Sequence, residues 1–251
     1  MPYEITTFPC STGGFMRWAR LEGPKPSRGC VIIHIGWGEW LEKYAADAEK
    51  WRRRGFETVV LERRGQALSS RFLENRNKAW LPDYSRLVED FDEFFRQIFD
   101  DEHEPLLLCG HSMGAHLLLR WMLEKRPRVA IKGVILLSPM QRILTPPFSY
   151  SMARLITAVA MMLGLSRHYA PGQESFDPVK TPFAGNFITH DEARYDAMVL
   201  ALRENPLLKS GGVTFGWLQA AFRSAEKLEK LLLLGAPRGP YLMLGAENDP
   251  L

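Results

Sequence analysis

The pentapeptide Gly110-His111-Ser112-Met113-Gly114 contains a serine whose surroundings suit nucleophilic chemistry. It directly follows an apolar run, Leu106 to Cys109, and opens a stretch of helical character from Met113 to Lys125. A serine on such a tight strand-to-helix turn is lifted clear of the sheet, and the flanking glycines avoid clashes that Cβ atoms would cause. We therefore predict that Ser112 is a catalytic nucleophile that forms an acyl-enzyme.

A nucleophile of this kind also needs N–H donors for the oxyanion that forms on the substrate. The helix that begins at Met113 directs free backbone amides toward the Ser112 hydroxyl. The loop His34-Ile35-Gly36-Trp37-Gly38-Glu39 follows another apolar run, and its glycines let the backbone turn the Trp37 N–H inward. We predict that the Trp37 and Met113 N–H groups form the oxyanion hole. His34 can be read as the base, but this loop supplies backbone donors, so a structural role is favoured; Glu39 is expected to hold the loop by hydrogen bonds.

These residues must be positioned by alternating strands and helices. Apolar runs typical of buried strands lie at 30–33, 58–61, 106–109, 134–137 and 241–244, and helical patterns lie at 41–54, 85–99 and 113–125. Strands separated by helices indicate an α/β fold, with a mostly parallel sheet covered by helices on both faces. Residues 4–10 and 15–21 alternate as two antiparallel strands do, which predicts a hairpin at the edge of the sheet.

The alternation lapses between Pro139 and about Lys227, a stretch rich in Met, Phe, Tyr, Trp and Pro. We predict that residues 141–227 form a cap inserted into a core made of residues 1–140 and 228–251. Soft, polarizable side chains suit an adaptable acyl-binding surface. An alternative is that these residues simply extend the core.

Composition sets outer bounds on the function. The chain has 251 residues, of which 46% are hydrophobic and 24% charged, so it can bury a sizeable core and is not a disordered chain. With a net charge of +3, the chain lacks the concentrated positive field that nucleic-acid binding needs.

The longest apolar stretch, Leu155 to Leu165, is too short to span a bilayer, and the N-terminus has no signal-peptide pattern. We therefore expect a cytoplasmic or peripheral location. The three cysteines, Cys10, Cys30 and Cys109, are expected to be reduced core residues, not a zinc site or a disulfide framework.

The chain resembles the α/β-hydrolases of the group that contains monoacylglycerol lipases and bacterial lysophospholipases. Gly36-Trp37-Gly38-Glu39 is similar to that group's oxyanion loop, and residues 62–71 resemble its Asp-x-Arg-Gly-x-Gly-x-Ser segment. Asn205-Pro206 and residues 212–218 resemble the lysophospholipase branch. Two positions depart from the pattern: Glu62 replaces the usual Asp, and Ala67 replaces the second Gly, which puts a tight turn at Ala67 in doubt.

The resemblance implies that Asp249, in the loop after the strand at 241–244, is the triad acid, with Glu247 as the alternative. In this fold the triad runs Ser, acid, His along the chain, so the base should follow Asp249. All six histidines precede it: His34, His103, His111, His116, His168 and His190. From this we expect a copy truncated at its C-terminus that hydrolyses esters poorly by itself, with His168 or His190 of the cap as alternative bases.

The function that the resemblance implies is a serine carboxylic-ester hydrolase for monoacyl lipids, either lysophospholipids or monoacylglycerols. It would use no cofactor and no metal, take a small acyl ester as its substrate, and contact membranes, if at all, peripherally through the cap. Two alternatives stay open: an amide or peptide hydrolase of the same fold, and an inactive or ligand-binding remnant.

Overall fold

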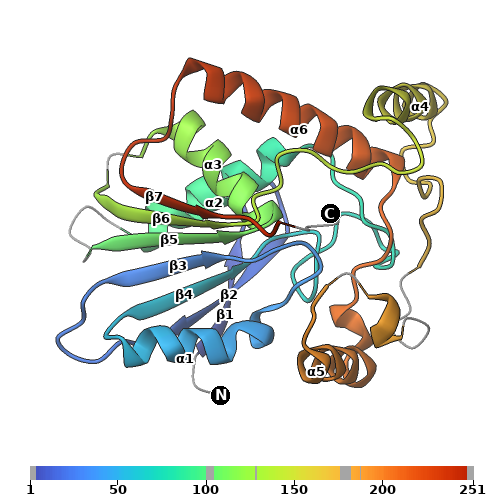
Figure 1. The fold of residues 1–251 in the computed structure, drawn as a ribbon. Helices are drawn as coiled ribbons and strands as arrows, with labels where there is room; N and C mark the ends of the chain where they lie inside the picture. Colours follow the sequence, from blue (N-terminus) through green and yellow to red (C-terminus); the bar gives the residue numbers. More distant parts are fainter. Residues whose placement is uncertain (1–3, 100–104, 128, 176–181, 187, 248–251) are drawn as a thin grey trace.

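The computed structural model describes residues 4–99, 105–127, 129–175, 182–186 and 188–247. Their strands form one sheet in the order β1-β2-β4-β3-β5-β6-β7 (Figure 1). The strands are β1 (Glu4–Pro9), β2 (Phe15–Leu21), β3 (Cys30–His34), β4 (Glu57–Glu62), β5 (Leu106–His111), β6 (Ile131–Leu137) and β7 (Tyr241–Leu244). From β4 to β7 all neighbouring strands are parallel, while β1 and β2 form an antiparallel hairpin at one edge. The mostly parallel sheet and the edge hairpin are therefore confirmed.

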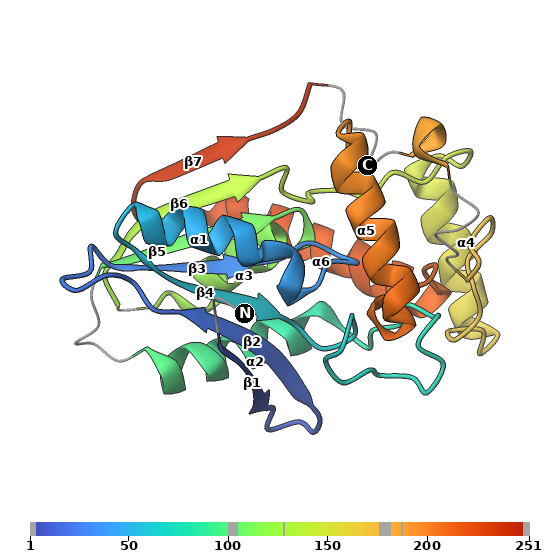
Figure 2. The same ribbon diagram turned by 90° about the horizontal axis from the view of Figure 1, so that it is seen from below.

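Helices cover both faces of the sheet, as predicted. Helix α1 (Ala45–Arg53) lies on one face, and α2 (Tyr84–Ile98), α3 (Met113–Lys125) and α6 (Phe215–Leu234) lie on the other (Figure 1). The first turn expected in α1 is instead a 3₁₀ turn, Leu41–Tyr44, that leads into the helix. Helices α4 (Tyr150–Met162) and α5 (Glu192–Glu204) lie beyond the carboxyl ends of the strands (Figure 2).

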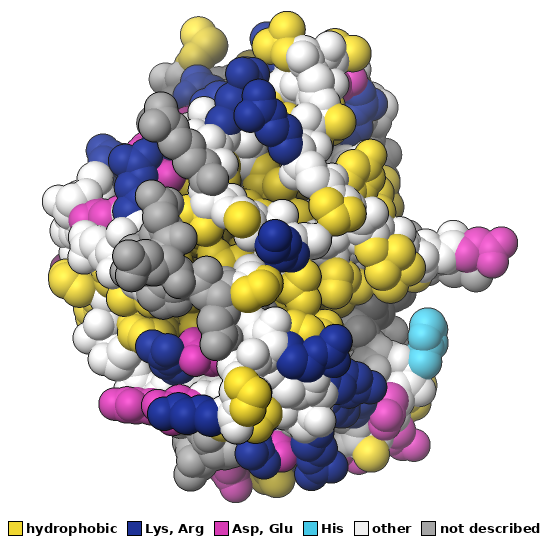
Figure 3. Space-filling view, turned by 90° about the vertical axis from the view of Figure 1, so that its left-hand side faces the viewer, with side chains coloured by type: hydrophobic (Ala, Val, Ile, Leu, Met, Phe, Trp, Pro, Cys, Tyr) yellow, Lys and Arg dark blue, Asp and Glu magenta, His cyan; other side chains and the backbone are white. Residues whose placement is uncertain are grey.

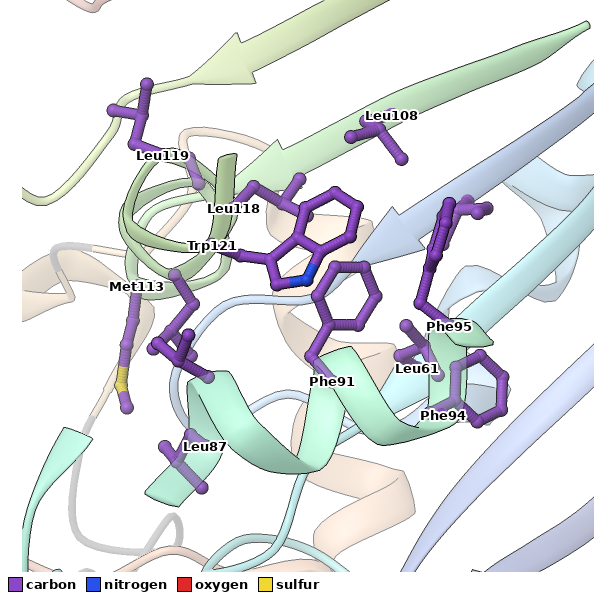
Figure 4. Packing of buried hydrophobic residues seen from close by; sticks show 14 of the residues in the cluster. Leu61, Leu87, Phe91, Phe94, Phe95, Leu108, Met113, Leu118, Leu119 and Trp121 are labelled. Atoms are coloured by element: carbon purple, nitrogen blue, oxygen red, sulfur yellow. The ribbon is translucent and has the colours of Figure 1, made fainter. Parts of the chain in front are cut away.

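The larger core cluster lies between the sheet and the helices α2, α3 and α6, and aromatic rings dominate it. The Trp121 ring of α3 lies 4.9 Å from the Phe91 ring and 4.7 Å from the Phe95 ring, both on α2 (Figure 4). Its indole N–H donates to Asp92 at 2.9 Å, so this large side chain is buried without an unsatisfied donor. This packing fixes α3, and with it the start of α3 where Ser112 lies.

Helix α6 joins the expected cap to the core. The predicted cap boundary at 227/228 falls inside this continuous helix, and its residues Trp217, Ala221 and Leu228 all belong to the larger core cluster. Thr214 is the N-cap of the helix: its hydroxyl accepts from the Trp217 N–H at 3.3 Å and donates to the Ala79 carbonyl at 2.7 Å. The cap-side end of α6 thus packs against the core that positions α3.

Strand β7 is the most exposed strand of the sheet. Its four residues are exposed, Tyr241 by 57%, and Leu233 and Leu234 at the end of α6 are exposed by 84% and 81%. Figure 3 shows the molecule from the left-hand side of Figure 1. In the middle of the face seen there, hydrophobic side chains lie with Lys and Arg around them. Within the described residues β7 pairs only with β6, so its outer edge offers backbone groups for pairing with a further strand.

Candidate active site

Ser112 lies on the sharp turn between β5 and α3, as the sequence predicts. Its backbone has φ 49° and ψ −117°, a conformation that residues with a side chain rarely adopt. Hydrogen bonds from other segments hold it there: the Ser112 N–H donates to Leu137 O at 2.8 Å, and its carbonyl accepts from the N–H groups of His116 at 3.1 Å and Met140 at 3.2 Å. The strained turn is therefore supported from β6 and from the loop that follows it.

The two glycines that flank Ser112 are required by close approaches of the backbone. A Cβ on Gly110 would lie 2.5 Å from the Cα of Ala115, in the first turn of α3. A Cβ on Gly114 would overlap the His34 carbonyl oxygen and lie 2.6 Å from that of Ile35. The start of α3 thus packs directly against the end of β3, where the predicted oxyanion loop begins.

The structure brings the predicted oxyanion donors to neighbouring strand ends. Strands β3 and β5 are adjacent, with His34 paired to Gly110, so the loop after β3 and the turn after β5 lie at the same edge of the sheet. Within the described residues, neither the Trp37 N–H nor the Met113 N–H donates to another protein group. The Trp37 ring lies 5.7 Å from the ring of Trp217 on α6, a contact that the sequence did not predict.

Glu39 holds the loop of residues 34–39, the predicted oxyanion loop, by hydrogen bonds, as expected from the sequence. Its carboxylate accepts from the Gly36 N–H at 2.6 Å, from the Tyr44 hydroxyl at 2.5 Å and from the Lys43 ammonium at 2.7 Å, and it lies 3.1 Å from His111 Nδ1. Burial acts to raise the pKa of Glu39, but its interactions with His111 and Lys43 outweigh burial and keep the pKa well below its ordinary value. Glu39 is therefore a fixed carboxylate and has no proton to give as an acid.

The loop after β4 keeps its tight turn despite both departures from the family pattern. The longer Glu62 side chain is buried and accepts from the backbone N–H groups of Leu68 at 3.0 Å and Ser69 at 2.8 Å. Ala67 adopts φ 38° at the turn, a left-handed conformation that costs an alanine about 1 kcal/mol. The doubt about a turn at Ala67 was therefore misplaced, because the bonds to Glu62 hold the segment closed.

Gln66 has a role in the structure that the sequence did not predict, although it lies within residues 62–71, the segment that resembles the family pattern. Its side chain is fully buried, and its amide NH₂ donates to the Gly36 and Glu39 carbonyls, both at 3.1 Å. The only signal in the sequence was its place between Gly65 and Ala67.

Two of the described histidines are buried and neutral. Burial and the nearby Arg63 lower the pKa of His34 to about 3, which makes it a poor base and agrees with a structural role. Burial also lowers the pKa of His116 to about 4, and its ring bonds to Ser224 Oγ at 2.6 Å and to Met140 O at 2.7 Å. In the part of the chain that the structure describes, no histidine ring is hydrogen-bonded to the Ser112 hydroxyl.

The remaining predicted candidates are exposed or lie outside the described residues. His168 and His190 are exposed in the cap region, and Glu247 is exposed in the segment after β7. Asp249, the predicted triad acid, lies outside the described residues. The structure therefore brings together Ser112, Met113 and the Trp37 loop, and it does not test the acid.

The buried histidines predict a stability that falls as the solution becomes acidic. The folded protein keeps His34 and His116 neutral down to pKa values of about 3 and 4, whereas the unfolded chain takes up protons near 6.5. The contribution of the two neutral histidines to the free energy of unfolding is therefore fully present above pH 6.5. Below pH 6.5 this contribution falls, by up to about 1.4 kcal/mol per pH unit for each histidine. Urea unfolding between pH 7 and pH 5 measures this slope, which His116→Gln should reduce. His168→Gln, which changes an exposed histidine, is the control; an equal slope in all three proteins would contradict the prediction.

Comparisons with known proteins show which proteins this chain is similar to. The chain is 26% identical to lysophospholipase L2 of Escherichia coli (strain K12) over 220 residues, which cover 87% of this chain and 63% of that protein. It is 23% identical to the monoglyceride lipase of Saccharomyces cerevisiae over 213 residues, which cover 74% of this chain and 66% of that protein. The chain thus spans a little under two thirds of the length of lysophospholipase L2.

The solved structure of a soluble variant of the Saccharomyces cerevisiae monoglyceride lipase, in complex with a substrate analog, superposes with a TM-score of 0.73. The match has 19% sequence identity and covers 99% of this chain and 78% of that one. An open form of a lipase superposes with a TM-score of 0.71 at 14% identity, over 96% of this chain and 79% of that one. These likenesses confirm the α/β-hydrolase fold. The model of the family described as serine aminopeptidase, S33, matches residues 25–251, and the chain belongs to this family of α/β-hydrolases.

Proposed function

We propose that this protein is a serine carboxylic-ester hydrolase that acts on monoacyl lipids, either lysophospholipids or monoacylglycerols. The observation that carries the proposal is the backbone of Ser112, held at φ 49° and ψ −117° where β5 meets α3. A structure keeps such strain where exposing a side chain serves its function. The names of the relatives, lysophospholipase and monoglyceride lipase, support the substrate class.

In the proposed reaction Ser112 Oγ attacks the ester carbonyl while its proton passes to a histidine base that Asp249 orients. The Trp37 and Met113 N–H groups stabilise the oxyanion, and both are free of other acceptors in the described structure. The C–O bond of the ester then breaks, the alcohol leaves with the proton, and water releases the fatty acid from Ser112. The chemistry needs no cofactor or metal.

We propose that residues 141–227 act as a cap over the acyl chain, with residues 1–140 and 228–251 as the core. Helices α4 and α5 lie beyond the strand ends that carry Ser112 and Trp37, which supports this division (Figure 2). The buried ring of Trp217 contacts the Trp37 ring, so the cap-side end of α6 borders the oxyanion loop. An apolar acyl chain suits such aromatic surroundings.

An apolar acyl site predicts a dependence on chain length. Each methylene that is buried contributes about 0.8 kcal/mol, so kcat/KM for esters should rise roughly fourfold per methylene until the site is full. The measurement compares butyryl, octanoyl and dodecanoyl monoglycerides with the full-length gene product. Equal or falling kcat/KM along the series would contradict a lipid substrate.

Turnover measurements also distinguish the proposed ester hydrolase from the two alternatives, an amide or peptide hydrolase and a ligand-binding remnant. An amide or peptide hydrolase would turn over an aminoacyl arylamide faster than any monoacylglycerol or lysophospholipid. A ligand-binding remnant would bind a monoacylglycerol without turning it over, and Ser112→Ala would then leave all readouts unchanged. The proposal expects turnover of the monoacyl lipids and its loss in Ser112→Ala.

We also propose that the outer face of α4 rests on lipid surfaces. Met152, Leu155, Val159 and Met162 repeat at helical spacing and are exposed by 50%, 61%, 47% and 87%, while Ala153, Thr157 and Ala160 face inward. Isolated apolar residues are common on protein surfaces, but a continuous stripe of them is typical of contact sites. No described helix is long and apolar enough to cross a bilayer, so any contact through α4 would be peripheral.

The α4 proposal predicts weaker vesicle binding when the stripe is made polar. Burying a leucine or methionine side chain contributes roughly 1.5–3 kcal/mol, so Leu155→Ser with Met162→Ser should lower the partition onto phosphatidylcholine vesicles by at least about tenfold. Flotation with vesicles measures the bound fraction. Leu200→Ser on α5, where the leucine is exposed by 55%, is the matched control. Equal binding by both variants would contradict the role of α4.

A further inference from the structure

One buried side chain ties both ends of the turn that carries Trp37. The Gln66 NH₂ group donates to the Gly36 carbonyl and to the Glu39 carbonyl, both at 3.1 Å. Gln66 is fully buried, so water does not compete for these two bonds. It reaches the turn from the loop after β4, the strand that pairs with β3.

These bonds fix the direction of the peptide between Gly36 and Trp37. The Gly36 N–H donates to the Glu39 carboxylate at 2.6 Å, and the Gly36 carbonyl accepts from Gln66. The only cis peptides among the described residues precede prolines, so the bond between Gly36 and Trp37 is trans. In a planar trans peptide the C=O and the following N–H point in opposite directions. Holding the Gly36 carbonyl toward Gln66 therefore turns the Trp37 N–H away from Gln66.

No direct hydrogen bond within the described residues fixes that N–H. Among the residues that the structure describes, it has no protein acceptor, and glycines lie on both sides of Trp37. Gly38 has φ 74°, and glycine rotates between backbone regions more readily than any other residue. Without the Gln66 amide, the peptide between Gly36 and Trp37 is free to rotate and to carry the N–H out of position.

We propose that Gln66 is a positioning residue that directs the Trp37 N–H toward the oxyanion. This inference rests on the proposed function, in which that N–H stabilises the oxyanion. Gln66 itself does not touch the substrate; it acts through the Gly36 carbonyl. An oxyanion donor is effective only when it is held in place before the charge forms.

The test replaces the amide by groups of similar size. Gln66→Met has no donor, and we expect its kcat to fall about 10- to 100-fold with KM changed less than about threefold, because the lost interaction belongs to the transition state. Gln66→His keeps one ring N–H and should recover part of kcat. Phosphonylation of Ser112 by an alkyl phosphonate ester should slow in parallel, since the phosphonyl oxygen occupies the same site.

A variant that loses buried contacts elsewhere in the core separates positioning from general destabilisation. Val59→Ala removes two methyl groups from a fully buried side chain on β4 without touching the loop. Its kcat should stay at the wild-type value even if its melting temperature falls as far as that of Gln66→Met. All measurements use the full-length gene product, with Ser112→Ala as the inactive reference.

The outcomes are distinct. Wild-type kcat in Gln66→Met, with Ser112→Ala inactive, overturns the role of Gln66 and leaves the proposed function standing. Equal loss of kcat in Gln66→Met and Val59→Ala also overturns it, because instability then explains the effect. Full activity in Ser112→Ala overturns the proposed function itself.

Discussion

Replacing Ser112 by glycine is expected to abolish ester hydrolysis while making the protein more stable. Loss of the nucleophile of a serine hydrolase lowers turnover by about 10⁴-fold or more. The backbone of Ser112, at φ 49° and ψ −117°, is strained for any residue with a Cβ, and glycine removes that strain. The strain released, about 1–3 kcal/mol, exceeds the roughly 0.5–1 kcal/mol of extra chain entropy that glycine loses on folding. We therefore expect the free energy of unfolding to rise by about 1 kcal/mol.

Ser112→Ala is the matched variant, because it removes the hydroxyl but keeps the Cβ. It should lose activity to the same extent without gaining stability. Urea unfolding and turnover of a monoacylglycerol, both with the full-length gene product, measure the two effects. If the glycine variant were no more stable than the alanine variant, the turn would not store strain. If either variant kept a tenth of wild-type turnover, Ser112 would not be the nucleophile.

Gly114→Ala is expected to have the largest effect on stability. In an ordinary helix interior this change stabilises by about 1 kcal/mol, because alanine is the better helix former. Gly114, however, packs against β3, and its Cβ would overlap the His34 carbonyl oxygen and lie 2.6 Å from that of Ile35. Both groups are backbone and cannot rotate away, so α3 must move from β3. We expect the free energy of unfolding to fall by roughly 3 kcal/mol or more, since overpacking and loss of core contacts add together.

Gly114→Ala should also lose activity. The expected shift of α3 away from β3 would separate the Ser112 turn from the loop that carries Trp37. Thermal unfolding of the purified variant and its turnover give the two readouts. Gly185→Ala is the control: its Cβ would meet no atom within 4 Å, so its stability should change by no more than about 0.5 kcal/mol. A Gly114→Ala protein as stable as the wild type would show that α3 and β3 are not packed as closely as described.

The sequence by itself determined the parts of the candidate site that depend on neighbouring residues. The apolar run before Gly110, the glycines beside Ser112 and the helical pattern after it are enough to predict the strand, the turn and the helix, and the structure has all three. Glu39 as the holder of its loop was likewise predictable, because its bond to the Gly36 N–H spans only three residues. Such features are set by local sterics and short-range hydrogen bonds, which a few adjacent residues encode.

Only the tertiary structure decided which distant segments support that site. The contact of Glu39 with His111 joins residues 72 positions apart, and the bonds of Gln66 reach back 30 and 27 positions to Gly36 and Glu39. The turn at Ala67 looked improbable from its residue type, and α6 crosses the boundary drawn from composition. The contacts of Glu39 and Gln66 depend on the pairing of β3 with both β4 and β5, which places three loops at one edge of the sheet. Strand order and register follow from the packing of the whole core, and no local pattern specifies them.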